Sequence, residues 1–255
     1  MGAVRISVYD QREAPAGGDA AMTGSVTFDE DVREHHHRID ADHWEDIYVV
    51  GDVHGCRDAL DRLVVRIDPD DRTLLVFVGD LVRKGPDSHA VVEFVRSSPN
   101  AVSVQGNNER KVIDGEKSVP GLTADDRAYM ESLPVVITWD DELVVHGGVD
   151  PRKPLADHTE RDLLEMRSFT PDNDYERPYW FERYSGSPRV FFGHTVLDAP
   201  HESAGAVGLD TGCVYGGELT AYHCETGAFV SVEPTETHQG RSADSIVSPT
   251  APAEQ

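Results

Sequence analysis

The stretch Ile47-Tyr48-Val49-Val50-Gly51-Asp52-Val53-His54-Gly55 joins an apolar run to a short polar motif bounded by glycines. A run of four apolar residues that stops at a glycine is typical of a buried strand. Asp52 and His54 then follow the strand at its carboxyl end. Two further runs have the same form: residues 74–78 before Gly79-Asp80, and residues 101–104 before Gly106-Asn107. The sequence therefore predicts three strands, each followed by polar side chains.

Helical periodicity appears between these strands. Apolar residues recur at i, i+3, i+4 and i+7 in the first intervening segment, at Leu60, Leu63, Val64 and Ile67. In the second we expect Ser88 to cap a helix whose inward side chains are Val91, Phe94 and Val95. Strands that alternate with helices predict parallel pairing with helical crossovers. In such sheets, ligands bind beyond the carboxyl ends of the strands, where the polar motifs lie.

The second half of the chain is richer in hairpins. After a helical stretch at residues 125–132, residues 135–139 and 142–145 flank Asp140-Asp141 and predict a hairpin. Helices are expected around residues 161–166 and 175–183. Further strands are expected at residues 190–192, 206–209, 219–223 and 229–232. We therefore predict an α/β protein with two mixed sheets packed face to face, helices outside, and a site on one rim.

The ends of the chain lack this patterning. Residues 1–45 are predicted to be a mostly irregular N-terminal extension, in which the histidine run at residues 35–37 is a solvated segment. Residues 46–233 carry the fold. Residues 234–255 contain mainly small and polar side chains and proline, so a disordered tail is expected.

The composition restricts the partners and the compartment. With 47 acidic and 23 basic residues, of which only four are lysines, the net charge is −24. Such a surface resembles those of cytoplasmic proteins from extreme halophiles, although an ordinary acidic mesophilic protein is the alternative. It argues against a nucleic-acid surface, which needs a basic stripe. No apolar run is long enough to span a membrane, and an odd number of cysteines, three, favours the reducing cytoplasm. The oligomeric state stays open.

Six polar residues beside glycines form a candidate metal-ligand set: Asp52, His54, Asp80, Asn107, His146 and His194. We expect Asp52 and His54 to hold one divalent ion, Asp80 to bridge, and the other three to hold a second ion. Two ions about 3.5–4 Å apart can clamp the attacking and leaving oxygens of a phosphoryl group. The mixed nitrogen and oxygen set favours Mn²⁺, with Zn²⁺, Fe or Ni²⁺ as alternatives, over Ca²⁺. Asp210 is assigned a structural role.

These motifs resemble those of the calcineurin-like metallophosphoesterases over about residues 46–225. The resembling patterns are Gly-Asp-x-His-Gly, Gly-Asp-x-Val-x-x-Gly-Pro-Asp-Ser, Gly-Asn-x-Glu, His-Gly-Gly and Gly-His-Thr. Within that superfamily the chain is similar to the branch of diadenosine-tetraphosphate hydrolases and Ser/Thr protein phosphatases, and residues 209–221 look most like the former. The resemblance implies a four-layer α/β/β/α sandwich and hydrolysis of a phosphate ester or anhydride.

The chain departs from the protein phosphatases at two positions. They carry Asp-Arg where this chain has Arg83-Lys84, and they carry a histidine, thought to protonate the leaving oxygen, where it has Asn108. A carboxamide can donate a hydrogen bond but cannot act as a general acid, whose contribution is about 10²–10⁴ in rate. A phosphoserine alkoxide needs that proton, whereas a nucleotide or polyphosphate leaving group needs it much less. The departures therefore favour dinucleoside polyphosphates, polyphosphate or a nucleotide cap as substrates.

The remaining site residues follow from the same comparison. We expect Asp80, Asn108, Lys84 and Arg167 to take part in catalysis. Substrate contacts are expected from Arg83, Lys84, Asn108, Arg167 and Tyr215. Two alternative functions stay open: a Ser/Thr protein phosphatase, and a non-catalytic regulator that binds a metal or a nucleotide.

Overall fold

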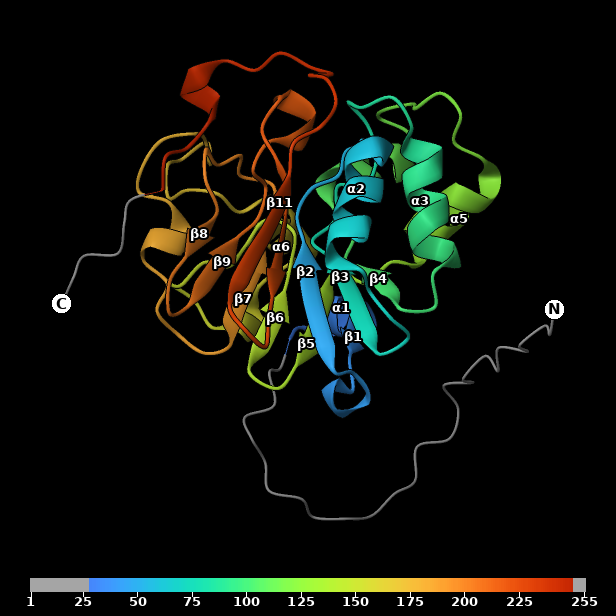
Figure 1. The fold of residues 1–255 in the computed structure, drawn as a ribbon. Helices are drawn as coiled ribbons and strands as arrows, with labels where there is room; N and C mark the ends of the chain where they lie inside the picture. Colours follow the sequence, from blue (N-terminus) through green and yellow to red (C-terminus); the bar gives the residue numbers. More distant parts are fainter. Residues whose placement is uncertain (1–27, 250–255) are drawn as a thin grey trace.

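Two mixed β-sheets packed face to face form the centre of the computed structural model, which describes residues 28–249 (Figure 1). The five-stranded sheet has the order β11-β10-β2-β3-β4. Its strands are β2 (Asp46–Val50), β3 (Thr73–Phe77), β4 (Ala101–Ser103), β10 (Leu219–His223) and β11 (Ala228–Val232). β2, β3 and β4 pair in parallel, and β10 and β11 are antiparallel. The predicted β-α-β alternation in this half is confirmed.

The six-stranded sheet has the order β1-β5-β6-β7-β9-β8. Its strands are β1 (His36–Arg38), β5 (Val136–Trp139), β6 (Glu142–Val144), β7 (Arg189–Phe192), β8 (His201–Glu202) and β9 (Ala206–Gly208). β5 and β6 form the predicted hairpin, whereas β6, β7 and β9 are parallel neighbours. Both sheets are therefore mixed, as predicted.

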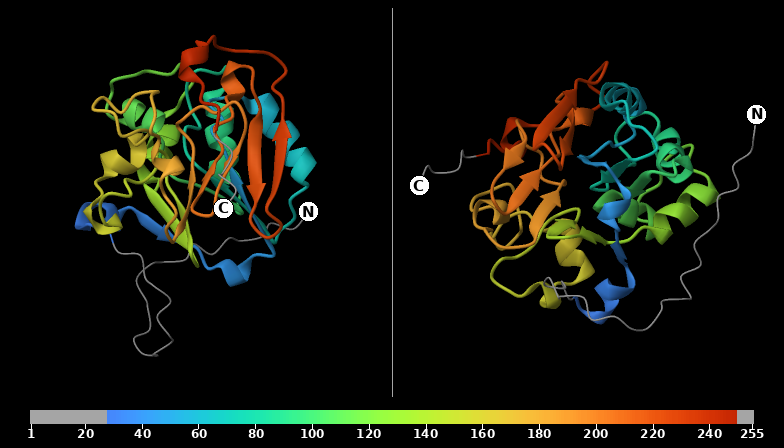
Figure 2. Two further views of the ribbon diagram at one scale, coloured as in Figure 1. Left: turned by 90° about the vertical axis from the view of Figure 1, so that its left-hand side faces the viewer. Right: turned by 60° about the horizontal axis from the view of Figure 1, so that its bottom comes forward.

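Helices cover the outer faces of the two sheets. The five-stranded sheet packs against α2 (Arg57–Ile67), α3 (Ser88–Ser97), α4 (Asn107–Ile113) and α5 (Ala124–Ser132). The six-stranded sheet packs against α1 (Glu30–Glu34) and α6 (Glu160–Glu165). The right-hand view of Figure 2 shows the cyan and green helices on the side opposite the orange strands. The expected order of helix, sheet, sheet and helix is thus present.

The pleat of the strands explains why both faces of each sheet are apolar. In β2, Ile47 and Val49 face the other sheet, whereas Tyr48 and Val50 face the helices. Successive side chains of a strand point to opposite faces, so a continuous apolar run is needed when both faces are covered. Trp139 and Phe191 stack between the sheets, with ring centroids 6.0 Å apart. The short apolar runs in the sequence are therefore strands buried on two sides.

The structured domain begins before residue 46. Phe28 and Val32 are buried against the six-stranded sheet, and β1 pairs in parallel with β5. Of the histidine run predicted to be solvated, His35 and His37 are exposed, but His36 and His37 also belong to the edge strand β1, where His36 Nε2 lies 2.7 Å from the Thr138 hydroxyl. These elements are only three to five residues long, too short for a periodic signal. The expectations for residues 1–27 and 250–255 lie outside the described residues.

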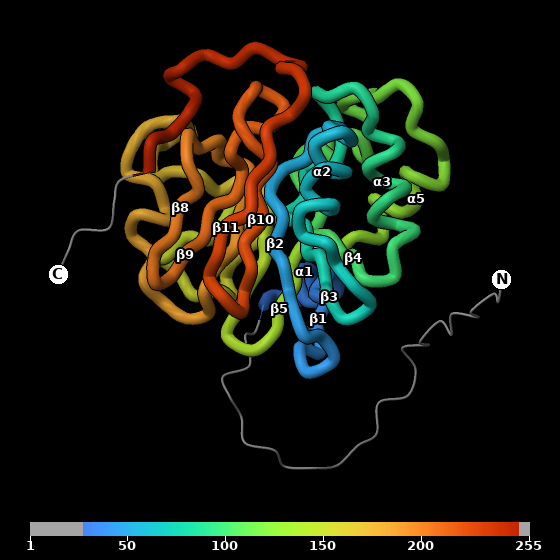
Figure 3. The backbone as a smooth tube through the Cα atoms, in the orientation of Figure 1, coloured from blue at the N-terminus to red at the C-terminus, as the bar shows by residue number. Residues whose placement is uncertain are grey.

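The C-terminal segment, residues 234–249, differs most from its prediction. It was expected to be disordered, but it crosses the end of the molecule where β2 and β3 finish (red in Figure 3). Val247 is 3% exposed and forms a β-bridge with Leu197. The segment also contains one short 3₁₀ helix, Ala243–Ser245. Backbone hydrogen bonds from the N–H groups of His238, Gln239 and Val247 hold the segment on the domain, and composition does not reveal them.

Local differences have simple causes. The helix predicted at residues 175–183 is wrong: the structure has one 3₁₀ turn there, Trp180–Glu182, because Pro178 cannot continue a helix. Asp87, not Ser88, caps α3 through a hydrogen bond from the Ala90 N–H. The other 3₁₀ turns are Ala41–His43, Leu155–Asp157 and Cys213–Tyr215. Among the described residues, no helix is long and apolar enough to cross a membrane.

The buried anchor of the C-terminal segment can be tested by a matched pair of substitutions. Val247→Ala removes apolar volume from a buried position and should lower the free energy of unfolding by about 1.5–3 kcal/mol. Val65→Ala makes the same change at a side chain that is 79% exposed and should change it by less than about 0.5 kcal/mol. Chemical denaturation measures both; equal effects would show that residue 247 is not packed as described.

Candidate metal centre

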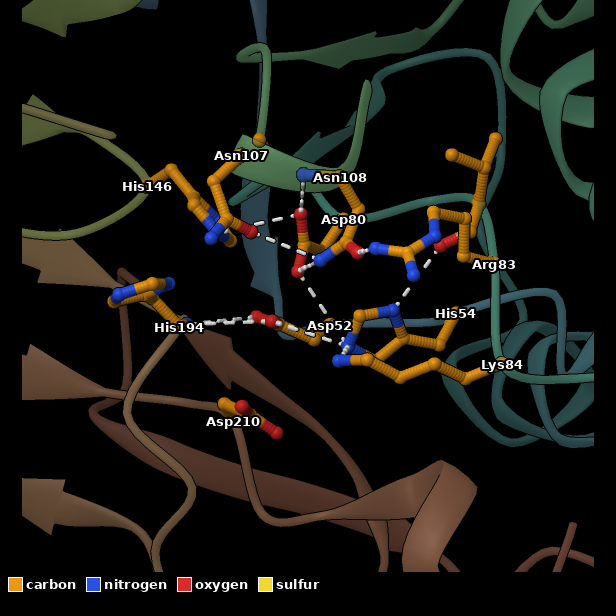
Figure 4. Close-up of polar contacts among 12 residues, drawn as sticks. Asp52, His54, Asp80, Arg83, Lys84, Asn107, Asn108, His146, His194 and Asp210 are labelled. Atoms are coloured by element: carbon orange, nitrogen blue, oxygen red, sulfur yellow. Dashed lines mark hydrogen bonds and ion pairs between the residues drawn. The ribbon is translucent and has the colours of Figure 1, made fainter. Parts of the chain in front are cut away.

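Loops from both sheets bring the six predicted ligand residues to one place (Figure 4). In the five-stranded sheet, the loop after β2 carries Asp52 and His54, the loop after β3 carries Asp80, and Asn107 begins α4 after β4. In the six-stranded sheet, His146 follows β6 and His194 follows β7. Because parallel neighbours end at the same edge, the cluster forms at the rim where both sheets finish.

The Asp80 carboxylate lies at the centre of the cluster. Its Oδ2 is 3.5 Å from His54 Nε2, and its Oδ1 is 3.3 Å from His146 Nε2. Ligand atoms of Asp52, His54 and Asp80 all lie within 4.8 Å of one another, so this group can hold a metal ion. Each Asp80 oxygen thus lies beside a different histidine, an arrangement that is compatible with the predicted bridging position.

The histidine tautomers are fixed by backbone carbonyls. The carbonyl of Val82 lies 3.1 Å from His54 Nδ1, and the carbonyl of Val78 lies 2.8 Å from His146 Nδ1. Each Nδ1 therefore carries the proton, and each Nε2 presents a lone pair to the cluster. His146 Nε2 is buried and has no hydrogen-bond partner. A buried, unpartnered imidazole nitrogen beside carboxylates fits a divalent metal ion of the Mn²⁺, Zn²⁺, Fe or Ni²⁺ type.

The cluster concentrates negative charge in a buried place. Burial and the neighbouring charges of Asp210 and Asp80 raise the pKa of Asp52 well above its ordinary value. Burial alone would raise the pKa of Asp80, but His146 and His54 hold it well below its ordinary value. Desolvated carboxylates so close together require compensating positive charge. The site therefore suits cations.

The backbone of the site is held in unusual conformations. Five residues of the predicted site have positive φ angles: His54 at 50°, Asp80 at 51°, Arg83 at 72°, Lys84 at 69° and His194 at 63°. Residues other than glycine rarely adopt this region, and each instance costs roughly 1–3 kcal/mol. Glu109 stabilises one of these turns, because its carboxylate accepts hydrogen bonds from the N–H groups of Asp80, Val82 and Gly106.

Asn108 and Arg83 form a pair. The Asn108 amide nitrogen donates to Asp80 and to the Asn107 side-chain oxygen, and the Arg83 guanidinium donates to the Asn108 carbonyl oxygen. The amide is therefore fixed in one orientation. Arg83, predicted to contact substrate, contacts Asn108. The two departures noted in the sequence thus act on each other.

Two other cations touch the cluster directly. Lys84 Nζ lies 2.7 Å from His54 Nε2, and an Arg167 guanidinium nitrogen lies 2.6 Å from His194 Nε2. Tyr215 packs on Lys84, whose Nζ is 5.3 Å from the ring centroid. Burial opposes the charged form of Lys84, but Asp80 raises the pKa of its ammonium group. The structure brings these three predicted residues to the edge of the cluster.

The sequence did not indicate three further residues near the site. Glu109 supports Asp80, and Tyr175 packs against Arg167 at 4.3 Å. Arg241 packs on Tyr215 at 4.7 Å, yet it belongs to a segment whose composition predicts disorder. The glutamate of Gly-Asn-x-Glu was a usable signal for Glu109, whereas Arg241 had none. Asp210 accepts a hydrogen bond from the Gly212 N–H at 3.1 Å, as a turn-stabilising residue would.

This geometry defines a class of protein, the α/β sandwiches that carry a candidate metal-ligand cluster at the rim shared by their two sheets. The sequence model of the calcineurin-like phosphoesterase family matches residues 46–227. The chain therefore belongs to the calcineurin-like phosphoesterase family, and it is a metallophosphoesterase.

Individual relatives carry two kinds of name. The chain is 29% identical to "Serine/threonine-protein phosphatase 1" of Salmonella typhimurium, over 73% of this chain and 95% of that protein. It is 30% identical to "Bis(5'-nucleosyl)-tetraphosphatase PrpE [asymmetrical]" of Halalkalibacterium halodurans, over 72% and 92% respectively. A crystal structure of a protein assigned as a diadenosine tetraphosphatase superposes with a TM-score of 0.69 and 30% identity, covering 78% of this chain and 97% of that one.

A glycine next to the cluster offers a steric test. A Cβ atom at Gly193 would lie 1.9 Å from Asp52 Oδ1, whereas a Cβ at Gly240 would meet nothing within 4 Å. Gly193→Ala should displace the Asp52 carboxylate and weaken Mn²⁺ binding by about tenfold or more, measured by calorimetric titration. Gly240→Ala should bind Mn²⁺ like the unmodified protein. Unchanged affinity in Gly193→Ala would contradict the close approach.

Proposed function

We propose that this protein uses two divalent metal ions to hydrolyse phosphoanhydride bonds in small phosphate compounds, with dinucleoside polyphosphates of the diadenosine tetraphosphate type as the preferred class and polyphosphate next. The observation that carries the substrate class is the Asn108 amide, which Arg83 fixes in the position where related phosphatases have a general acid. Several relatives named as bis(5'-nucleosyl)-tetraphosphatases support the same class.

The proposed metal ligands follow the loop order. Asp52 and His54 hold the first ion, Asp80 bridges, and Asn107, His146 and His194 hold the second. When bound, such a pair of ions supplies an activated water and stabilises charge on the phosphoryl oxygens. We expect Lys84 and Arg167 to bind phosphoryl oxygens; the contact of each cation with one edge of the cluster supports this role. We also expect Asn108 to contact substrate, by turning one of its N–H donors away from Asp80 or Asn107, and Tyr215 to flank the substrate.

Two finer assignments belong to the same proposal. Mn²⁺ is the preferred metal, because imidazole nitrogen and carboxylate oxygen ligands are mixed in the set. A reducing, salt-rich cytoplasm is the proposed environment: the cysteines at positions 56, 213 and 224 are all unpaired, and the net charge is −24. Salt screens the self-repulsion of such a surface.

A Ser/Thr protein phosphatase is the second candidate. Its support is the relative named serine/threonine-protein phosphatase 1, which is 29% identical. Against it stands the absence of a titratable side chain at position 108, because the leaving serine alkoxide is strongly basic. A comparison of anhydrides with phosphoserine peptides separates the two candidates.

Metal content provides the first test. The Mn²⁺-loaded protein should contain about two equivalents by elemental analysis, and Asp80→Asn should lower this content and most of the activity, because it removes charge from both sites. Asn107→Ala should lose less, because it removes a neutral ligand of one site. Asp71→Asn, at an exposed loop position, controls for the loss of a carboxylate. A fully active Asp80→Asn enzyme would exclude the bridging role.

Leaving-group dependence provides the second test. Without a general acid, rates should fall steeply as the leaving-group pKa rises, so anhydrides and aryl esters should react far faster than alkyl esters. The double change Arg83→Asp with Asn108→His should raise alkyl-ester hydrolysis by up to about 10² and change anhydride hydrolysis little. Asn108→His alone is the control, since that histidine would lack an orienting carboxylate. Equal native rates on phosphoserine peptides and anhydrides would favour the protein phosphatase.

A further inference from the structure

The C-terminal segment is anchored on both sides of the metal centre. At one side, Thr235 donates from its N–H and its hydroxyl to Asp58 in the first turn of α2, at 2.9 and 2.7 Å. At the other side, the Val247 N–H donates to the Val196 carbonyl, two residues beyond His194, at 2.8 Å. The segment therefore crosses the rim on which the metal cluster lies, as the red trace in Figure 1 shows.

Arg241 is the cation that this crossing brings to the rim. Its guanidinium lies 4.9 Å from the ring centroid of Tyr175 and 4.7 Å from that of Tyr215. Each ring also contacts a second cation: Arg167 packs on the Tyr175 ring, and Lys84 packs on the Tyr215 ring. Arg241 thus shares one tyrosine ring with each of the two cations that touch the cluster of candidate metal ligands.

Arg241 makes no close ion pair among the described residues, although its charge acts on the buried Asp210 carboxylate and offsets part of the rise that burial causes in the pKa of that group. Its Nε donates to the Ser245 carbonyl at 2.7 Å, but within residues 28–249 no carboxylate oxygen lies within 4.0 Å of it. At least nine of the sixteen other arginines among residues 28–249 have such a partner, for example Arg57 with Asp61 and Arg189 with Glu142. Arg241, Arg167 and Lys84 gather three positive charges around two rings. Asp80 and Asp210 offset part of their mutual repulsion, and a bound anion would offset more of it.

We propose that Arg241, held between Tyr175 and Tyr215, is a distal phosphate subsite that binds the phosphoryl groups beyond the scissile one in a chain of three or more. This inference rests on the proposed function and specifies its substrate. A single phosphoryl group can be held by Lys84 and Arg167 without Arg241, because Arg241 contacts Tyr175, Tyr215 and Ser245 and not the cluster itself. The phosphoryl groups further along a polyphosphate chain can reach it, and a guanidinium suits two of their oxygens at once.

Steady-state kinetics of Arg241→Gln test the subsite. The ratio of the KM for diadenosine tetraphosphate to the KM for p-nitrophenyl phosphate should rise about tenfold or more, the effect of one lost charge-assisted hydrogen bond, with kcat for the tetraphosphate less affected. Arg66→Gln is the matched control: Arg66 is exposed, lies in the last turn of α2, and also donates one hydrogen bond to a backbone carbonyl. It removes the same charge and should leave the ratio unchanged.

Binding without turnover separates this inference from the proposed function. Calorimetric titration of the metal-free protein with tripolyphosphate should show weaker binding in Arg241→Gln, partial recovery in Arg241→Lys, and no such difference with orthophosphate. If the enzyme cleaved no anhydride but kept this pattern, the proposed function would fail and the subsite would stand.

Two results would overturn the subsite. One is an unchanged KM ratio together with equal tripolyphosphate affinity in Arg241→Gln and the unmodified protein. The other is an equal loss for one-phosphate and long-chain ligands in both Arg241→Gln and Arg241→Lys, which would show that Arg241 only holds the segment in place. Thermal melts of both variants establish that the fold is retained.

Discussion

The Asp80 carboxylate is the interaction on which the rest of the site depends. It is 2% exposed, and its two oxygens face His54 on one side and His146 on the other. A buried charge of this kind is stable only when it is paired and hydrogen-bonded. The neighbours of Asp80 come from loops of both sheets. Glu109 stabilises the turn that carries Asp80, because its carboxylate accepts hydrogen bonds from three backbone N–H groups. The sandwich has to bring its two sheets to a common rim for this carboxylate to be satisfied.

The loops that carry the candidate ligands also approach one another closely. At Gly106, an added Cβ would lie 2.3 Å from the Asp80 side chain, and at Gly193 it would strike Asp52. Glycine is therefore needed at positions 106 and 193, because a carboxylate group fills the space that a side chain there would take. The positive φ angles at His54, Asp80 and His194 show that the backbone also bends sharply to aim the ligands.

Arg83 and Asn108 are coupled by a direct hydrogen bond. The family resemblance implies a histidine oriented by a carboxylate at these positions, whereas here a guanidinium donates to the side-chain carbonyl oxygen of a carboxamide. The residue at position 83 therefore donates the hydrogen bond instead of accepting it, and a hydrogen bond still joins the two side chains. The amide nitrogen still faces Asp80 and Asn107, so the position keeps a donor and loses a titratable proton. That loss is tolerable where the leaving group is already a stable anion.

The sequence alone determined the two mixed sheets, the helices between parallel strands and the clustering of the six polar motifs, because short apolar runs and glycine stops record local backbone requirements. It did not determine the ends of the domain. Phe28, Val32 and Val247 lie in mainly polar stretches without a periodic apolar pattern, and only their burial against distant strands gives them a role. Nor could it pair Arg83 with Asn108 or bring Arg241 between two tyrosines. Those contacts join residues that are distant in the sequence, so they form only when the chain has folded and the loops of both sheets lie side by side.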